Sequence, residues 1–577
     1  MAEPAAQPSS PIFKPKLFTV LRGYSRVQFI ADAIAGLTVG VVALPLALAF
    51  GIASIPEHVA REAGLSPPAM GLFTAIIAGF VISFFGGSRV AIGGPTGAFV
   101  VIVYAIADQH GYDGLFYATV LAGVMLVAMG VARLGTLIKF IPYPVTTGFT
   151  TGIAVIILTS QIKDLLGLGM HADAIPVPPD FVGKVRWCSS HLDTINWHAT
   201  ALGVAMVIGL FLWKRVMPRR VPGPIFLLIG VTVVAQVFHL DAQTIGDRFG
   251  AIPSSLPMPH LPKLDYAGLK DLVGPAGTIA MLAAIESLLC CVVADGMLGT
   301  RHRSNTELVA QGLANIAAPL FGGIPATGAI ARTATNVQAG GRTPVAGIIH
   351  AGVLAVIMVT VAQYAELIPL SALAGILVVV AWNMSELHRF RWLLNGPKQD
   401  TLVLLATFGL TVFTDLTIAV GVGMVLAAIL FMKRMADVAN VTTVGLGGAP
   451  RDATTAEVRA HDAMIPPGVA VYAINGPFFF GAAYKLRETL DGIGSRPHTL
   501  IIDVSNVMSV DATGLHALEE MLHASRARGT RVILAGVHKR PMFAIATKGI
   551  LDRLGDENLA ADVETALEMM PGRETSG

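Results

Sequence analysis

Two glycine-rich segments interrupt the long apolar stretches of this sequence and share one pattern. The first carries Phe85-Gly86-Gly87 and then Thr96-Gly97-Ala98, and the second carries Phe321-Gly322-Gly323 and then Thr327-Gly328-Ala329. Glycine and proline exclude a single spanning helix through either segment. Non-helical backbone at membrane depth is tolerated only where protein covers it or a water-filled cavity borders it. We therefore expect each segment to enter in extended form and then to begin a short helix.

A helix that begins inside a membrane presents unpaired N–H groups and a partial positive charge at its first turn. Such a terminus is an anion site, and matched interrupted segments in two halves of a chain are typical of transporter substrate sites. The alternative, two ordinary glycine-rich loops, does not account for the shared pattern. The candidate substrate-binding residues are Phe50, Thr96, Gly97, Ala98, Phe99, Gly328, Ala329, Ile330, Ala331 and Arg332.

Arg332 falls in the first turn of the second short helix, which we expect from about Ala329 to Val337. Its guanidinium adds a full positive charge to the partial charge of the helix terminus. Phe50 follows Pro45 in the first apolar span, which we expect to be broken there. It is placed to wall the site, although a plain helix kink at the proline explains the pattern nearly as well.

Glu286 lies in the middle of the apolar run Ala283–Cys290. A carboxylate inside a membrane is costly and normally faces a cavity or a partner. We interpret Glu286 as the residue that carries a coupling proton. The alternative is a purely structural ion pair with Arg332, and the two interpretations overlap if that pair breaks during transport.

Composition places these residues in a polytopic membrane protein that crosses a lipid bilayer. The chain has 577 residues, of which 54% are hydrophobic and 14% charged, and its mean hydropathy is +0.66. A net charge of +2 argues against a nucleic-acid partner. The sequence has no phosphate-binding loop, no His-Glu-x-x-His and no Cys-x-x-Cys, so we expect no enzyme activity, no cofactor and no metal.

The apolar runs predict an α-helical membrane domain of about fourteen spans, built as a repeat of about seven plus seven. We expect a cytoplasmic segment at 1–27, a transmembrane domain at 28–436 with inverted repeats near 28–240 and 265–436, and a linker with a soluble domain at 437–577. Lysine and arginine concentrate in alternate short loops, which predicts that both termini are cytoplasmic.

The soluble domain has strands that alternate with helices. Val469–Ile474, Thr499–Val504 and Arg531–Val537 are apolar and β-branched, and helical sequence follows each of them. This alternation predicts a small α/β domain.

These features resemble the SulP family of anion transporters, whose C-terminal domain is a STAS domain. The resemblance rests on the two interrupted segments, on Ala284–Cys290 and on Asp503-Val504-Ser505 with Asp511–Gly514. It implies an anion held between the two short helices, a core domain that moves against a gate domain in an elevator-like way, and a homodimer. It also implies a bacterial inner-membrane location and a possible cytoplasmic protein partner of the STAS domain.

Three departures from family patterns bear on coupling and regulation. Sodium-coupled bicarbonate members have Asp where this chain has Glu286, and Thr where it has Cys290, which favours a proton over sodium. Ala512 stands where related anti-sigma-factor antagonists carry a phosphorylated serine, so that phosphoswitch is impossible here.

We therefore expect secondary active transport of a small anion with a proton, either sulfate or a C4-dicarboxylate such as fumarate or succinate. Ala284–Cys290, with Val293–Met297 and Ala329–Arg332, resembles the corresponding residues of C4-dicarboxylate-carrying bacterial members. The alternatives are sodium-coupled bicarbonate symport, an uncoupled anion channel or exchanger, and a membrane-anchored signalling protein. An anchor needs no anion site, so the paired short helices argue against the last.

Overall fold

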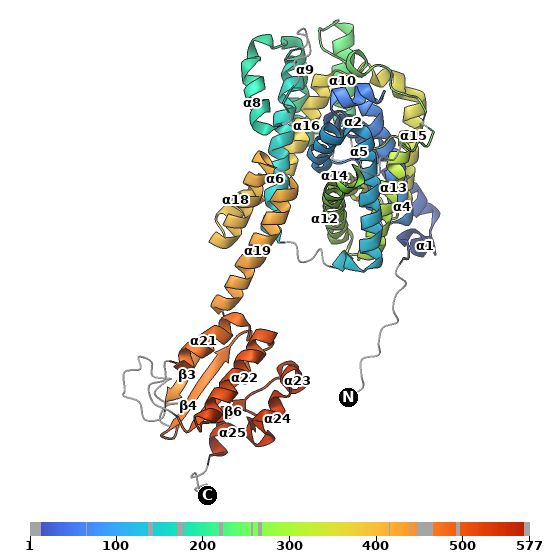
Figure 1. The fold of residues 1–577 in the computed structure, drawn as a ribbon. Coiled ribbons are helices and arrows are strands. Elements are labelled where there is room, and N and C mark those ends of the chain that lie inside the picture. Colours follow the sequence, from blue (N-terminus) through green and yellow to red (C-terminus); the bar gives the residue numbers. More distant parts are fainter. Residues whose placement is uncertain are drawn as a thin grey trace. The chain divides into compact units, whose positions relative to one another are not determined.

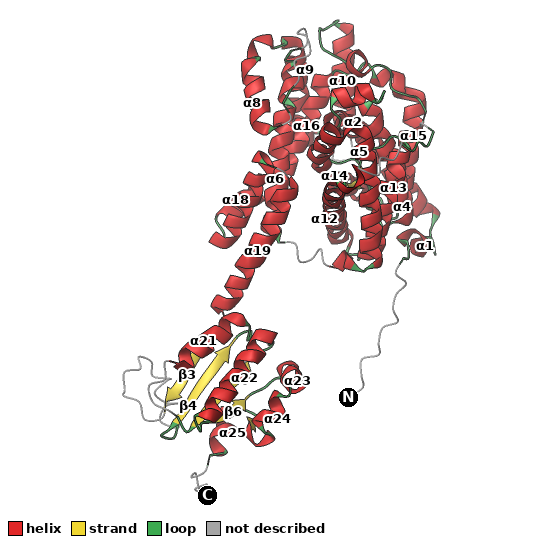
Figure 2. Cartoon of the chain, in the orientation of Figure 1, coloured by secondary structure: helices red, strands yellow, loops and turns green. Residues whose placement is uncertain are grey.

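The computed structural model describes residues 13–64, 66–136, 142–169, 177–178, 180–217, 223–255, 258–262, 268–414, 416–438, 440–446, 465–491 and 497–570. Residues 1–12 of the expected N-terminal segment therefore lie outside the described residues. The chain divides into two compact units, Met1–Met424 and Val425–Gly577, and each is presented by itself. The first is almost entirely helical, and the second contains a five-stranded sheet (Figure 2).

In the first unit, the principal helices form two packed groups (Figure 1). The core group comprises α2 (Arg26–Ser54), α4 (Pro67–Phe85), α5 (Gly97–Val131), α12 (Val273–Leu298), α13 (Ser304–Leu320), α14 (Ile330–Gln338) and α15 (Val345–Ala365). The gate group comprises α6 (Tyr143–Ser160), α7 (Ile162–Leu166), α9 (Trp197–Val216), α10 (Gly223–Val237), α16 (Leu370–Met384), α17 (Leu387–Leu394) and α18 (Lys398–Phe413). Helix α19 (Leu416–Val438) follows and continues into the second unit.

Short helices precede these principal helices or lie between them in the chain. They are α1 (Lys16–Val20), α3 (Glu57–Glu62), α8 (Phe181–Ser190) and α11 (Ile245–Phe249). Among the described residues, eight helices are long and apolar enough to cross a membrane. The predicted fold class is confirmed in its helical membrane part, and the number of fourteen spans stays a prediction.

Of two expected breaks in the first repeat, the structure lacks one and contains the other. Helix α2 continues through Pro45 instead of breaking there; the buried small residues Ala43, Ala47 and Ala49 flank the proline on this well-packed helix. The first short helix and the span after it are joined in α5, with one non-helical residue, Gly111, at φ 68°. Only glycine adopts that conformation readily, so Gly111 marks the end of the half-helix.

The second unit is an α/β domain whose sheet has the order β3 (Asn440–Leu446), β4 (Val469–Asn475), β5 (Thr499–Asn506), β6 (Arg531–Ala535) and β7 (Leu559–Ala560). Strand β3 is antiparallel to β4, and the other pairs are parallel. Side chains of β4 alternate between two apolar clusters, one on each face. Strand β3 was not predicted, because it directly follows a long apolar helix and lies where a linker was expected.

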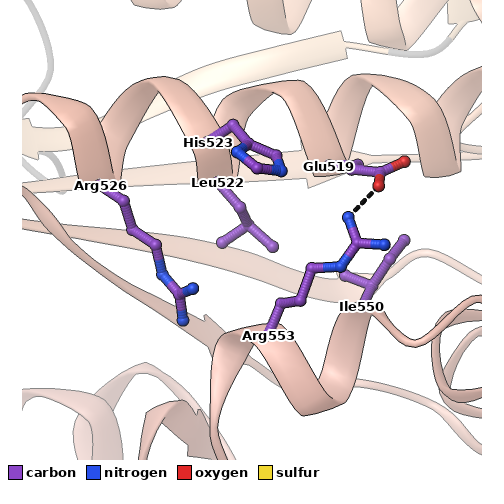
Figure 3. A pocket seen from close by; sticks show the side chains of 6 residues that line it. All are labelled: Glu519, Leu522, His523, Arg526, Ile550 and Arg553. Carbon is purple, nitrogen blue, oxygen red and sulfur yellow. Dashed lines mark hydrogen bonds and ion pairs between the residues drawn. The ribbon is translucent and has the colours of Figure 1, made fainter.

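Helices complete this domain: α21 (Phe480–Asp491), α22 (Ala512–Ala527), α23 (Lys539–Thr547), α24 (Ile550–Leu554) and α25 (Val563–Glu568). Asp511 caps α22 by accepting a hydrogen bond from the Gly514 N–H at 2.7 Å. A shallow pocket between α22 and α24 is lined by Glu519, Leu522, His523, Arg526, Ile550 and Arg553 (Figure 3). Arg553 pairs there with Glu519, and Arg526 adds a further positive charge to the lining.

Candidate anion-binding site

The two interrupted segments meet in the core group. Strand β1 (Gly93–Gly94) pairs antiparallel with β2 (Thr327–Gly328), so that Gly93 lies opposite Gly328 and Gly94 opposite Thr327. The Ala329 N–H also donates to the Ile92 carbonyl at 2.7 Å. Helix α5 leaves one strand and α14 leaves the other. The paired segments predicted from the sequence therefore form one joint structure, which we call the crossing.

Helix α14 holds the first extended segment through its buried face. The Arg332 guanidinium donates to the Pro95 carbonyl, the Thr333 hydroxyl accepts from the Ile92 N–H at 2.9 Å, and the Asn336 amide donates to the Val90 carbonyl at 2.9 Å. Buried backbone groups need such partners. Thr333 and Asn336 were not among the predicted site residues, and their polar positions at helical spacing from Arg332 were the available signal.

The second extended segment is held in the same manner. The Thr74 hydroxyl accepts from the Ile324 N–H at 2.7 Å, and the Asn315 side chain bonds both the N–H and the carbonyl of Ala326 at 2.9 and 2.8 Å. All of this extended backbone is therefore covered by protein, as membrane depth requires.

Neither half-helix has a side-chain cap at its N-terminus. Thr96, the residue before α5, directs its hydroxyl elsewhere and donates to Glu286 Oε2 at 3.1 Å. Thr96 and Glu286 are partly exposed, as are Ile330 and Ala331 at the start of α14, whereas Ala98 and Phe99 are buried. The first-turn N–H groups of both half-helices therefore have no side-chain partners. They lie beside residues that are at least partly exposed.

The start of α5 also faces the gate group. A Cβ atom on Gly97 would lie 3.4 Å from Phe50 Cε1, 3.3 Å from Ile157 Cδ1 and 3.0 Å from Met384 Sδ. Phe50 belongs to α2, whereas Ile157 and Met384 belong to α6 and α16 of the gate group. The half-helix terminus therefore lies at the boundary of the two groups, and glycine lets side chains of both groups approach it closely.

Arg332 lies behind the crossing and is only 2% exposed. A Cβ atom on Gly94, whose φ is +147°, would lie 2.5 Å from Arg332 Nη1. The structure pairs Arg332 with Pro95 and Glu286 with Thr96, and between the described residues Glu286 and Arg332 it shows no ion pair. The purely structural pairing of those two side chains is therefore not what this structure contains.

Sequence comparison matches residues 29–407 to the sulfate permease family and residues 461–566 to the STAS domain. The chain belongs to the sulfate permease family. It is 40% identical over 539 residues to the putative sulfate transporter YvdB of Bacillus subtilis, covering 93% of this chain and 97% of that one. It is 30% identical over 550 residues to the bicarbonate transporter BicA of Picosynechococcus, covering 93% and 94%.

Solved structures agree with this assignment. The transmembrane domain of a cyanobacterial bicarbonate transporter BicA aligns with a TM-score of 0.59 at 29% identity, covering 70% of this chain and 98% of that one. The overall structure of SLC26A9 aligns with a TM-score of 0.80 at 18% identity, covering 96% and 92%, which shows a shared fold. This sulfate permease family member is a polytopic membrane transporter with a C-terminal STAS domain, and it is not an enzyme.

In this family member, one arginine connects the core and gate groups away from the crossing. Arg248 of α11 forms ion pairs with Glu57 of α3 and with Asp164 of α7, the latter at 2.7 Å. Helix α3 packs against α5, and α7 packs against α9 and α16. Burial alone would lower the pKa of Arg248, but Asp164 and Glu57 outweigh it and raise that pKa above its ordinary value. Arg248 is therefore charged at every physiological pH.

We expect Arg248→Gln to lower the melting temperature of the detergent-purified protein by a few degrees. The substitution leaves two carboxylates facing each other, and removing one partner of a buried charge pair costs about 2–5 kcal/mol. Arg389→Gln is the matched control, because its pair with Glu386 is exposed and such pairs contribute little. Equal melting temperatures for wild type and Arg248→Gln would show that the ion pairs of Arg248 do not stabilise the protein.

Proposed function

We propose that this protein is a secondary active transporter that moves a small anion together with a proton across the bacterial cytoplasmic membrane. The anion binds at the starts of α5 and α14, where N–H groups without side-chain caps and helix dipoles favour negative charge. The core group, with the crossing inside it, moves against the gate group in an elevator-like way. Both termini lie in the cytoplasm, and the protein works as a homodimer.

The observation that carries this proposal is the 3.1 Å hydrogen bond from Thr96 to Glu286. It puts a carboxyl group next to the N-terminus of α5. An ionised Glu286 satisfies the positive end of that helix and repels a second anion. A protonated Glu286 leaves the terminus free for the substrate. Anion and proton then bind together, which is the thermodynamic requirement for symport.

Sulfate and C4-dicarboxylates such as fumarate and succinate are the substrates we propose. The relative YvdB supports sulfate, and the likeness of Ala284–Met297 to the bacterial C4-dicarboxylic acid transporter DauA supports dicarboxylates. Sodium-coupled bicarbonate symport is the second candidate, because BicA is similar over nearly the whole chain. An uncoupled channel or exchanger has no such support, since it gives Glu286 no role.

The deciding experiment is uptake by purified protein in liposomes. Labelled sulfate, fumarate, succinate and bicarbonate are offered in turn, each with an inward pH gradient, an inward sodium gradient or neither. We expect one of the first three anions to accumulate, driven by the pH gradient. Accumulation of bicarbonate driven by sodium would replace this proposal with the second candidate.

We expect the STAS domain to be dispensable for anion binding. The proposed roles of this domain are regulation, assembly or docking of a cytoplasmic protein. Truncation after Val438, at the end of α19 and before β3, should leave the anion dissociation constant within about threefold of the full chain. Isothermal titration on both proteins tests this, with a melting curve as the control for folding. A folded truncation that binds no anion would contradict the prediction.

A further inference from the structure

Hydrogen bonds hold residues 13–21 against the core group at the end of α4, and we call this segment the strap. The Lys16 N–H donates to the Gly86 carbonyl at 2.8 Å, and the Lys16 ammonium donates to the Arg301 carbonyl at 2.9 Å. In return, the Arg303 guanidinium donates to the Lys14 carbonyl at 2.7 Å. These bonds hold residues 13–21 against two loops that are far apart in the sequence.

The strap brings three positive charges together, and we call Lys16, Arg89 and Arg303 the basic cluster. Burial lowers the pKa of Lys16, and the charges of Arg303 and Arg89 lower it further. Arg89 Nε is buried without a hydrogen-bond partner, and within the described residues no member of the cluster has an ion pair. The nearby Asp295 already accepts bonds from Thr300 and His302. Asp295 nevertheless supplies a negative charge that raises the pKa of Lys16, so the positive charge of the cluster is only partly neutralised.

Five phenylalanine rings lie beside this cluster, and we call them the aromatic ladder. The ring centroids are 6.3 Å apart for Phe13 and Phe85, 4.9 Å for Phe85 and Phe84, 5.9 Å for Phe84 and Phe18, and 5.6 Å for Phe84 and Phe80. Phe13, Phe18 and Phe80 are 40%, 52% and 42% exposed. Because α4 is long and apolar enough to span the bilayer, its last turns and this aromatic ladder lie at the membrane surface.

We propose that the basic cluster and the aromatic ladder together bind one anionic phospholipid. The headgroup phosphate sits on Lys16, Arg89 and Arg303, and the upper acyl chains lie against the exposed rings. Basic residues beside the membrane attract anionic headgroups, and aromatic rings favour the interface. A free small anion would use the charges but leave the rings exposed to water, so the combination favours a lipid. Bound lipid would fix the strap and the loop before α13.

Native mass spectrometry of the full-length protein tests this proposal. Delipidated protein is titrated with phosphatidylglycerol and, separately, with phosphatidylcholine. We expect wild type to retain phosphatidylglycerol preferentially, and Lys16→Gln/Arg89→Gln to bind it roughly ten- to thirty-fold more weakly. The control Arg389→Gln/Arg391→Gln removes the same charge from α17 and should bind like wild type. Should the first double variant fail to fold, Arg303→Gln takes its place with a smaller loss.

Three results would overturn the proposal. One is equal retention of phosphatidylglycerol by wild type and the folded cluster variant. Another is an equal loss in the α17 control, since the effect would then follow net charge alone. The third is displacement of the bound lipid by millimolar inorganic phosphate that itself binds lipid-free protein, because the cluster would then be a site for free anions.

Discussion

Glu286→Gln is expected to keep anion binding but to lose the acceleration of uptake by an inward pH gradient. Glutamine resembles the protonated carboxyl group, so it still accepts the Thr96 hydrogen bond seen at 3.1 Å and leaves the α5 terminus free for the anion. It cannot release a proton. A charged carboxylate inside a span costs about 2.5–3.5 kcal/mol on insertion scales, and we expect wild type to avoid most of that cost by binding a proton with the substrate.

The measurement is liposome uptake at a fixed substrate concentration, with and without the pH gradient, in wild type and in the variant. Binding by isothermal titration is the companion readout, because a merely structural defect would weaken it. Glu286→Asp keeps an ionisable group and should retain partial coupling. If wild-type uptake ignores the pH gradient and follows a sodium gradient, proton symport is wrong.

Arg332→Ala should weaken anion binding by roughly tenfold or more. The guanidinium lies behind the crossing, where a unit charge near a buried anion contributes on the order of 1–4 kcal/mol at an effective dielectric constant of 20. The half-helix dipoles remain and contribute about 0.3–2 kcal/mol, so binding is reduced but not abolished. Arg332→Lys keeps the charge and should recover much of the affinity.

Asn336→Ala is the matched control for this experiment. Asn336 holds the same extended segment, through the Val90 carbonyl, but carries no charge. If both alanine variants weaken anion binding equally in titration, Arg332 only stabilises the structure of the crossing. Unchanged affinity in folded Arg332→Ala would remove the arginine from the anion site altogether.

The sequence allowed the half-helices and Glu286 to be predicted, because glycine, proline and an intramembrane carboxylate are local signals. The sequence did not predict how the two interrupted segments contact each other. Arg332 was assigned to the anion, and nothing local indicated its bond to Pro95. The contacts of Gly97 with Ile157 and Met384 depend on how two helix groups pack, and the partners of Arg248 come from two distant helices. Such contacts depend on tertiary structure, which a periodic pattern does not encode.

The crossing has a consequence for biosynthesis. The Ile92 N–H is satisfied by Thr333, which is 241 residues further along the chain. At about 5–20 residues per second, the ribosome needs on the order of tens of seconds to make that stretch. During this interval, the first extended segment has no partner from the second repeat, although its polar backbone is destined for membrane depth. Water or a membrane insertase must therefore cover this backbone until the second repeat arrives, so the proposed binding site cannot assemble before Thr333 has been made.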